Sequence, residues 1–336
     1  MKVTPEQLKQ RLAWPLDMKL EYFCKKISEF VIHCKGECYS GFSAGKDSQT
    51  GCDIIDKIWD GTFKHITPNW DRLVSYPKPN KVFSNTGLEY PEIVLHAKEH
   101  NAEIIKPKMG FTRVIAEIGV AIISKEVSQK IREIRTTKSD KLRNKRLYGD
   151  DKGNGKIPEK WKPYIDAPFL ISDQCCTKLK KDPFKNYEKQ TGKKPIVFTT
   201  VGESRLRDSS YYTTGCNTLD EGKEKCRPYS IFTEADTWEY HNRFGLKFAS
   251  VYYERDVEVK QLDGSYKLEH LPPVERTGCT FCMFGIHLDK GSNRMQNMAI
   301  SHPIFHNIII NKCGLGKVFD WMGIPYYPVK SSCKAD

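Results

Sequence analysis

The chain has 336 residues, of which 39% are hydrophobic, and this is enough for one large domain or two smaller ones with a real core. Its mean hydropathy is −0.57, and no apolar run is long enough to cross a bilayer. The first residues also lack the apolar stretch of a signal peptide. These features argue against a membrane-spanning protein, and we expect a soluble cytoplasmic one.

The formal net charge is +12, and two segments carry it. Residues 124–162 contain thirteen Lys and Arg against six Asp and Glu, while residues 175–194 contain seven Lys against two acids. Such a surface attracts nucleic acid or nucleotide phosphates, but a solvated basic face without a partner explains segment 124–162 equally well. The polar, Gly-bearing stretch 135–156 is also typical of a mobile excursion from the fold.

Apolar periodicity predicts helices and strands that alternate along the chain. In chain order they are a helix over 17–33, a strand over 38–42, a helix over 46–59, a strand over 81–84, a helix over 90–100, a strand over 102–105, a mostly helical segment over 172–190, a strand over 195–201 and a helix over 233–243. This order predicts an α/β, Rossmann-like fold in which helices cover both faces of a parallel sheet. Ligands of such sheets bind at the carboxyl ends of the strands, where we expect three polar loops to converge.

The stretch FSAGKDS, residues 42–48, follows the first predicted strand and opens the next helix. Gly45 lets the backbone approach a phosphate closely, and the helix presents free N–H groups and the positive end of its dipole. The serines can donate hydrogen bonds, Lys46 adds a cation, and Asp47 is suited to hold Mg²⁺ or to cap the helix. An N-capping turn with Ser or Asp as the cap explains the same residues. The stretch lacks the Walker A pattern.

This loop resembles the PP-loop of the adenine-nucleotide α-hydrolases, which include ATP pyrophosphatases and the phosphoadenosine phosphosulfate (PAPS) reductase family. Further blocks resemble the PAPS reductase family in particular and follow its order: VFSNTGLEYPE at 82–92, CCTKLKKDPF at 175–184, GESRLRDSS at 202–210, PYSIFTEADTWEY at 228–240 and ERTGCTFCMFG at 275–285. The resemblance implies a PP-loop fold that binds ATP, PAPS or adenylyl sulfate. It implies catalytic roles for Lys46, Asp47 and Arg207, and nucleotide binding by Ser43, Ala44, Gly45, Lys46, Asp47, Ser48, Asn85, Thr86, Gly87, Gly202, Glu203 and Arg205.

With this resemblance we expect three regions. Residues 1–35 form an N-terminal helical segment, and residues 36–250 form the nucleotide-binding α/β domain with a basic insertion at 124–165. Residues 251–336 form a C-terminal segment that completes a set of cysteines.

Four of the twelve cysteines form two close pairs, Cys175-Cys176 and Cys279-x-x-Cys282. Four thiolates can hold a zinc ion or a [4Fe–4S] cluster, and four unrelated buried thiols are the third interpretation. Adjacent cysteines suit one tetrahedral zinc poorly because their side chains diverge. The spacing is similar to the [4Fe–4S] set of adenylyl-sulfate reductases, so we favour iron–sulfur over zinc. Cys216 and Cys226 are candidates for additional or replacement ligands, and most other cysteines are expected to be small buried hydrophobes.

Charged side chains near these blocks have two interpretations each. The basic run Lys178, Lys180, Lys181 and Lys185 directly follows the first cysteine pair, and three of these lysines, 178, 181 and 185, share one helical face. They can balance the charge of a cluster or hold sulfate or phosphate, although a solvated lysine face is the simpler interpretation. Asp236 is expected to be structural. His287, five residues after Cys282, is a candidate hydrogen-bond donor to the ligands of the cluster, although most single histidines have no functional role.

Two reactions fit the resemblance. The first is reduction of PAPS or adenylyl sulfate to sulfite by a thiol donor such as thioredoxin, but the C-terminal Glu-Cys-Gly-x-His motif of such reductases is absent, and only Cys313 and Cys333 lie near the end. The second is cleavage of Mg²⁺–ATP at its α-phosphate, with pyrophosphate release and sulfur transfer to an acceptor. The lysine in the loop resembles the ATP-using branches, which include enzymes that modify nucleic acid. A nucleotide- or cluster-sensing regulator without catalysis is a third interpretation.

Overall fold

The computed structural model describes residues 3–203 and 205–328. The chain divides into two compact units. Unit 1 comprises residues 1–85, 91–105 and 184–252, and unit 2 comprises residues 86–90, 106–183 and 253–336. None of the described helices is long and apolar enough to span a membrane.

Unit 1 is built on a six-stranded sheet in the order β3-β2-β1-β5-β7-β6. All neighbouring strands run parallel except the antiparallel pair β6 and β7. The strands are β1 (Cys38–Gly41), β2 (Asn80–Ser84), β3 (Glu103–Ile105), β5 (Lys194–Val197), β6 (Asn217–Thr218) and β7 (Lys225–Cys226). The mostly parallel sheet confirms the predicted α/β class.

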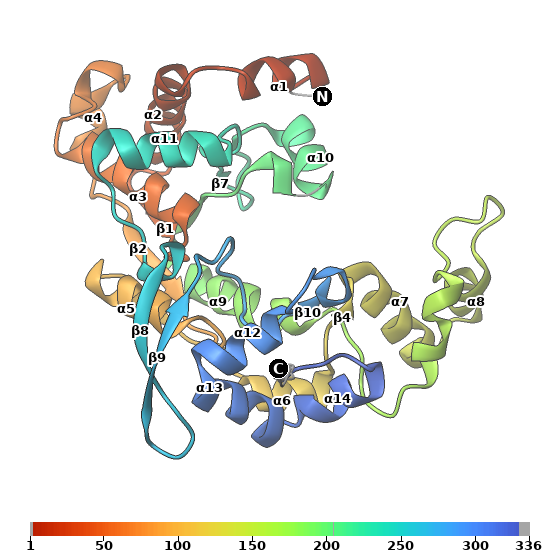
Figure 1. The fold of residues 1–336 in the computed structure, drawn as a ribbon. Helices are drawn as coiled ribbons and strands as arrows, with labels where there is room; N and C mark the ends of the chain where they lie inside the picture. Colours follow the sequence, from red (N-terminus) through yellow and green to blue (C-terminus); the bar gives the residue numbers. More distant parts are fainter. Residues whose placement is uncertain (1–2, 204, 329–336) are drawn as a thin grey trace. The chain divides into compact units, whose positions relative to one another are not determined.

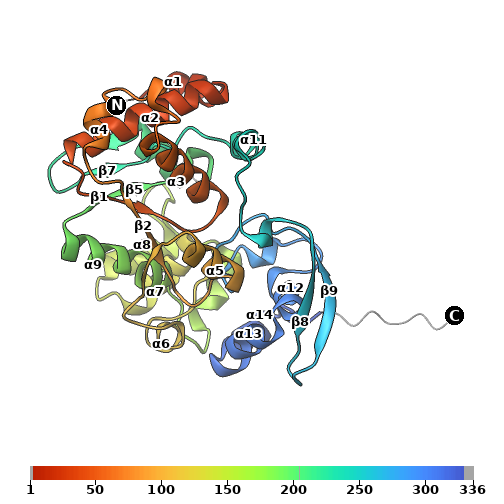
Figure 2. The same cartoon turned by 90° about the vertical axis from the view of Figure 1, so that its left-hand side faces the viewer.

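Helices cover both faces of this sheet (Figures 1 and 2). On one face α9 packs against Tyr39 and Val82 through Phe184 and Tyr187. On the other face α2 packs against α3, α11 and β7. The helices of unit 1 are α1 (Pro5–Leu12), α2 (Leu16–His33), α3 (Lys46–Trp59), α4 (Trp70–Val74), α5 (Pro91–Glu99), α9 (Asp182–Thr191), α10 (Arg205–Thr214) and α11 (Glu234–Phe244), with 3₁₀ turns at Lys64–Ile66, Val201–Glu203 and Ser250–Tyr252.

Local sequence explains the elements that hold the core of unit 1. In α2, Phe23, Ile27 and Phe30 recur at helical spacing and are fully buried. The helix α11 begins at a capping box between Thr233 and Asp236 and ends at Gly245, whose φ of 65° a glycine tolerates. Asp236 also accepts a hydrogen bond from the buried Lys19 at 2.6 Å, so it has the structural role expected of it.

Unit 2 has little sheet and is built mainly from helices around one apolar cluster that includes Ile122, Ile131, Met295 and Phe319. Its helices are α6 (Phe111–Arg113), α7 (Lys125–Thr136), α8 (Asp140–Tyr148), α12 (Arg294–Ser301), α13 (Pro303–Asn307) and α14 (Leu315–Met322). Its strands are β4 (Ile122–Ile123), β8 (Arg255–Lys260), β9 (Tyr266–Leu271) and β10 (Met283–Phe284). Short π-helical turns lie at Val114–Ile118, Thr177–Lys181 and Ile308–Lys312, and 3₁₀ turns at Glu159–Asp166 and Ile286–Leu288.

Three segments differ from the sequence-based expectation. The strand expected over 195–201 ends at Val197, and the next residues form a 3₁₀ turn. The segment over 172–190 is helical but contains a π-helical turn, which changes the residues that share a face. The polar stretch 135–156 contains the helix α8, which is started by the hydroxyl of Ser139 as its N-cap.

Candidate functional site

In unit 1 the loop after β1 lies where the strand order of the sheet reverses. β2 and β3 follow on one side of β1, and β5 lies on its other side. Gly41 is in register with Val82 of β2 and Val197 of β5, so the segments after these strands leave the sheet at one edge. Such a switch point is the usual ligand site of an open α/β sheet. This arrangement confirms that FSAGKDS, Asn85 and the segment after β5 share an edge.

The backbone of the loop is shaped for close approach of a ligand. Ala44 is buried and has a φ of 54°, which is uncommon for a residue other than glycine. Gly45 is the N-cap of α3 and makes no side-chain cap hydrogen bond. The interpretation of the loop as a turn capped by Ser or Asp is therefore wrong. A helix start whose N-cap residue has no side chain, with the positive dipole end facing the loop, favours an anion there.

The two serines of the loop bond within it. Ser43 donates its backbone N–H to Ser48 Oγ at 3.1 Å, and the two hydroxyl oxygens lie 2.9 Å apart. Ser48, which is buried, donates its hydroxyl to the carbonyl oxygen of Gly45 at 3.0 Å. Ser48 therefore holds the shape of the loop, and Ser43, which is exposed, is the serine whose hydroxyl a ligand can reach.

Lys46 is enclosed by side chains of α11 and of the turn before residue 253. Its Nζ lies 2.5 Å from Glu234 Oε1, 5.0 Å from the ring centre of Trp238 and 5.4 Å from that of Tyr252. Its backbone N–H also donates to Tyr252 Oη at 3.4 Å. The side chain of Lys46 is 11% exposed and that of Glu234 is 71% exposed. Sequence reasoning missed Glu234, Trp238 and Tyr252, because no local pattern links them to residue 46.

Asp47 lies in the first turn of α3. Burial raises the pKa of Tyr229, and the charge of Asp47 raises it further, so the carboxylate lies near that phenol. A carboxylate directly after Lys46 gives the loop both a cation and an oxygen donor of the type that Mg²⁺ prefers.

The other residues expected to bind nucleotide belong to different units. Asn85, in unit 1, continues the sheet by donating its backbone N–H to Ile105 at 2.9 Å. Thr86 and Gly87 belong to unit 2, and Thr86 bonds Glu89 through its backbone N–H at 2.9 Å and through its hydroxyl at 2.8 Å. The hydroxyl of Thr86 is thus used within unit 2.

The expected arginine loop is partly helical. Gly202 is exposed in the 3₁₀ turn after β5. Arg205 and Arg207 lie in the first turn of α10, and their expected place in a loop is therefore wrong. The side chains of Glu203, Arg205 and Arg207 lie outside the described part of the structure, so their assigned roles stay predictions.

The four paired cysteines all belong to unit 2 and influence one another. A hydrogen bond between Cys175 and Cys176 raises the pKa of Cys175 and lowers that of Cys176 to about 6. The charges of Cys279 and Cys282 raise the pKa of Cys175 further. Burial raises the pKa of Cys279 to about 11, and it also raises that of Cys282. Residues 103 positions apart in the sequence are therefore neighbours in this unit.

One lysine and one glutamate accompany the cysteines. Burial alone would lower the pKa of Lys180, but Cys279, Glu89 and Cys176 together raise it. Lys180 Nζ lies 3.9 Å from the buried Glu89. The lysines expected from helical spacing were Lys178, Lys181 and Lys185, and Lys178 pairs with Asp182 at 3.3 Å instead. Lys180 belongs to the basic run identified from the sequence, but it was not placed on the shared face, because the π-helical turn changes the spacing.

The chemistry of these cysteines suits a metal cluster, but their placement does not form a metal-binding group. Four thiols beside a lysine are a suitable donor set for an anionic iron–sulfur cluster. As placed, however, no three or more His, Cys, Asp or Glu side chains within residues 3–203 and 205–328 form a group that could hold a metal ion. The zinc and [4Fe–4S] expectations therefore stay predictions.

The other candidate ligand thiols belong to unit 1, and the candidate histidine belongs to unit 2. Cys216 and Cys226 are buried in unit 1, where burial raises the pKa of both. His287 is exposed and lies edge-on to Trp161, 5.3 Å between ring centres. Cys333 lies outside the described residues.

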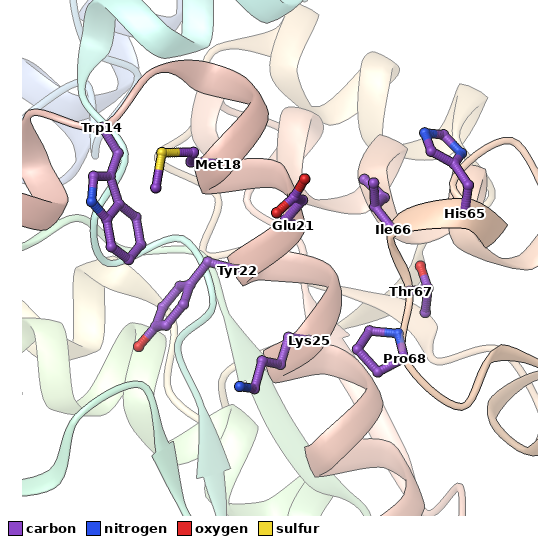
Figure 3. Close-up of a pocket in the computed structure, with 9 residues that line it drawn as sticks. All are labelled: Trp14, Met18, Glu21, Tyr22, Lys25, His65, Ile66, Thr67 and Pro68. Atoms are coloured by element: carbon purple, nitrogen blue, oxygen red, sulfur yellow. The ribbon is translucent and has the colours of Figure 1, made fainter.

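Unit 1 also has an open hollow of about 530 Å³ beside α2 (Figure 3). It is lined by Trp14, Met18, Glu21, Tyr22, Lys25, His65, Ile66, Thr67 and Pro68. None of these residues belongs to FSAGKDS or to the paired cysteines, so the hollow and the predicted site are distinct.

The comparisons with known proteins are sparse. No protein-family model matches the chain, and no curated protein matches it. Among solved structures, the chain is similar to a phosphoadenylyl-sulfate (PAPS) reductase from Candida auris in a phosphate complex, at 12% sequence identity and a TM-score of 0.34. That alignment covers 75% of this chain and 92% of the other. At such a TM-score the likeness carries no argument, and the fold is established here by the strand order of the sheet itself.

Proposed function

We propose that the chain is an enzyme that binds an adenine nucleotide at residues 43–48 and cleaves ATP at its α-phosphate. In this reaction an acceptor oxygen attacks the α-phosphorus, the bond from that phosphorus to the bridging oxygen breaks, and pyrophosphate leaves with the electron pair. The adenylylated acceptor is then ready for replacement of its activated oxygen by sulfur. The observation that carries the proposal is the N-terminus of α3 behind Ala44, where Gly45 offers no capping side chain, at the switch point of the sheet.

The loop offers separate roles for its side chains. The backbone N–H groups of the first turn of α3 and the dipole would bind the pyrophosphate oxygens, with the N–H of Lys46 exchanging its 3.4 Å bond to Tyr252 Oη for one to the ligand. Lys46 would neutralise the leaving pyrophosphate, and Mg²⁺ bound with the nucleotide would be held by Asp47. Releasing Lys46 from Glu234 costs little, because an ion pair with an exposed partner contributes at most about 1 kcal/mol. A charge-assisted bond to phosphate, at about 1.5–3 kcal/mol, offsets that loss.

The cysteines of unit 2 would hold a [4Fe–4S] cluster in this proposal. Support comes from the two cysteine pairs in the sequence and from their mutual influence in unit 2. A bound cluster would supply electron-transfer or sulfur-handling chemistry. The proposed cleavage of ATP requires no step at these cysteines, so the two parts can be tested separately.

The test is release of pyrophosphate from Mg²⁺–ATP by the anaerobically purified chain. We expect Lys46→Ala to lower kcat/KM for this release by about 10²–10³-fold, the size typical of losing one transition-state donor. The matched control is Lys64→Ala, since Lys64 also pairs with a carboxylate, Asp71, and lies 4.3 Å from the ring centre of Trp70. This control should leave the rate unchanged.

Two results would overturn the proposed reaction. Sulfite release from PAPS or adenylyl sulfate that is lost in Cys333→Ser would identify a sulfonucleotide reductase. Tight ATP binding without turnover would identify a nucleotide sensor.

A further inference from the structure

We propose that the basic arm of unit 2, residues 137–162, binds the phosphate backbone of a nucleic acid. The arm contains nine Lys and Arg against four Asp and Glu. This inference goes beyond the proposed nucleotide chemistry and does not rest on it. It concerns a surface away from residues 43–48 in the sequence, and it is tested by binding alone.

Ion pairs and hydrogen bonds of three arginines fix the arm to the rest of unit 2. Arg132 at its root pairs with Asp173 at 2.9 Å, and Arg135 donates to four backbone carbonyl oxygens between residues 164 and 169. Arg146 pairs with Glu133 of α7 at 2.5 Å, which fastens α8 to its neighbour. These arginines are occupied by the fold and are not part of the proposed surface.

The helix α8 itself contributes little to the apolar core, which it contacts through the half-buried Leu147. None of its residues is buried, and Tyr148 at its end is 70% exposed. In Figure 1, α8 and the loop after it extend from the rest of unit 2, beyond α7. Because none of its residues is fully buried, most charged side chains of α8 are accessible to a partner.

The cationic side chains of the arm fall into two groups, those that form an ion pair within it and those that do not. Arg143, Lys145 and Lys162 pair with acids of the arm itself, at 3.6, 3.4 and 2.9 Å. Five other lysines are exposed and form no ion pair with another described residue: Lys138, Lys141, Lys152, Lys156 and Lys160. Three of the four acids of the arm, Asp140, Asp150 and Glu159, are thus paired within it, whereas these five exposed lysines are not, although Lys160 Nζ lies 4.9 Å from the ring centre of Trp161.

A set of uncancelled ammonium groups on one protruding element complements a regular line of phosphates. Each phosphate that a lysine neutralises releases a counterion from the nucleic acid, and this release favours binding. Five such contacts to duplex DNA predict that log K falls with log salt concentration at a slope of about −4 to −5. A merely solvated face has no such slope.

The experiment is fluorescence anisotropy with a labelled nucleic acid of mixed sequence, as single strand and duplex, DNA and RNA, over a range of salt concentrations. The test variant changes the five exposed lysines of the arm to Gln. The matched control changes five exposed lysines of unit 1 to Gln: Lys9, Lys35, Lys98, Lys223 and Lys247. Because none of the ten side chains is buried, both variants should keep the thermal stability of the wild type.

We expect the wild type to bind at low salt with the steep slope, and the arm variant to lose more than about tenfold in affinity and most of the slope. The unit 1 variant and Lys46→Ala should bind like the wild type. Absence of binding at low salt overturns the proposal. So does an equal loss in both five-lysine variants, since general charge then explains binding, or loss in Lys46→Ala alone, which would locate the binding at the loop.

Discussion

Unit 1 and unit 2 contain similar side chains in different surroundings. In unit 1, Cys24 and Cys52 are enclosed, and burial raises the pKa of each thiol to about 12. In unit 2, the four paired cysteines change the pKa of one another and lie beside Lys180. The comparison teaches that a cysteine-rich chain does not make every cysteine a candidate ligand. Thiols among apolar side chains behave as small hydrophobes, whereas thiols that share one surface with a cation have the setting for chemistry.

The largest expected effect tests this contrast directly. If the cysteines of unit 2 bind a cluster, Cys279→Ser should abolish bound iron and sulfide in anaerobically purified protein, because a missing thiolate leaves the set incomplete. Iron and sulfide analysis with the visible absorption spectrum measures this. Cys24→Ser in unit 1 is the control and should keep the wild-type iron content. A wild-type protein with no bound iron or sulfide would contradict the cluster.

The next effect concerns how tightly each unit is packed. A Cβ on Gly51 of α3 would lie 2.1 Å from the ring of Phe198, whereas a Cβ on Gly316 of α14 would lie 3.0 Å from the Cγ2 methyl of Ile310 and 3.2 Å from its carbonyl oxygen. Overpacking lowers the free energy of unfolding by up to about 3 kcal/mol, whereas replacing a helical glycine by alanine raises it by at most about 1 kcal/mol. We expect Gly51→Ala to destabilise unit 1 by about 2 kcal/mol and Gly316→Ala to be nearly neutral, as measured by thermal unfolding.

A double variant checks the cause of that loss. Gly51→Ala combined with Phe198→Leu should lose less stability than the sum of the two single variants, because the smaller side chain removes the overlap. Additive losses would show that the ring is not the obstacle.

One buried histidine in each unit gives a smaller, pH-dependent effect. Burial, with the charges of His100 and Lys81, lowers the pKa of His96 in unit 1 to about 4. Burial also lowers the pKa of His306 in unit 2, but its Nε2 bonds the carbonyl oxygen of Tyr326 at 2.8 Å, which opposes the shift. In the unfolded chain the imidazole of His96 has a pKa of about 6.5, so on acidification it binds its proton at a higher pH than it does in the folded protein. Stability is therefore lost as the pH falls from 6.5 to 4, by at most about 1.4 kcal/mol per pH unit for His96.

Ring-proton NMR titration measures both histidines, and we expect the pKa of His96 to lie below that of His306. In His96→Leu, the decrease in melting temperature between pH 7 and pH 5 should shrink. An unchanged decrease would mean that His96 does not supply this pH dependence.

The smallest expected effect concerns the carboxylate that holds Lys46. Glu234→Gln removes the negative charge that pairs with Lys46. ATP binding should then strengthen two- to fivefold, because the lysine no longer has to break an ion pair of about 1 kcal/mol before it binds phosphate. Isothermal titration with ATP measures this, and the increase should disappear in Lys46→Ala. Weaker binding in Glu234→Gln would show instead that Glu234 orients the lysine or contacts the ligand.

Much of unit 1 followed from its sequence. The helix expected over 46–59 is α3, and the strand expected over 38–42 is β1. Apolar spacing decides such elements because it reflects which face can be buried, and this is a local property. The position of FSAGKDS at the carboxyl end of a central strand followed from the alternation of strands and helices.

Unit 2 was less predictable because parts of it do not follow the regular local spacing on which such predictions depend. Its π-helical turn over 177–181 brings Lys180, which is not on the ideal helical face, beside the cysteines, while Lys181 of that face also lowers the pKa of Cys176. Helical spacing assumes 3.6 residues per turn, and one inserted residue invalidates it. The helix α8 was also missed, since it has no apolar stripe to reveal it.

The sequence by itself determined that the chain has an α/β core with a Gly-Lys-Asp-Ser loop after its first strand, because periodicity and glycine act over a few residues. Only the tertiary structure decided that Gly45 caps α3, that Arg205 begins a helix, and that Trp238 and Tyr252 enclose Lys46. Those partners lie about two hundred residues along the chain from the lysine. Contacts of that kind depend on the packing of whole elements, which no local pattern encodes.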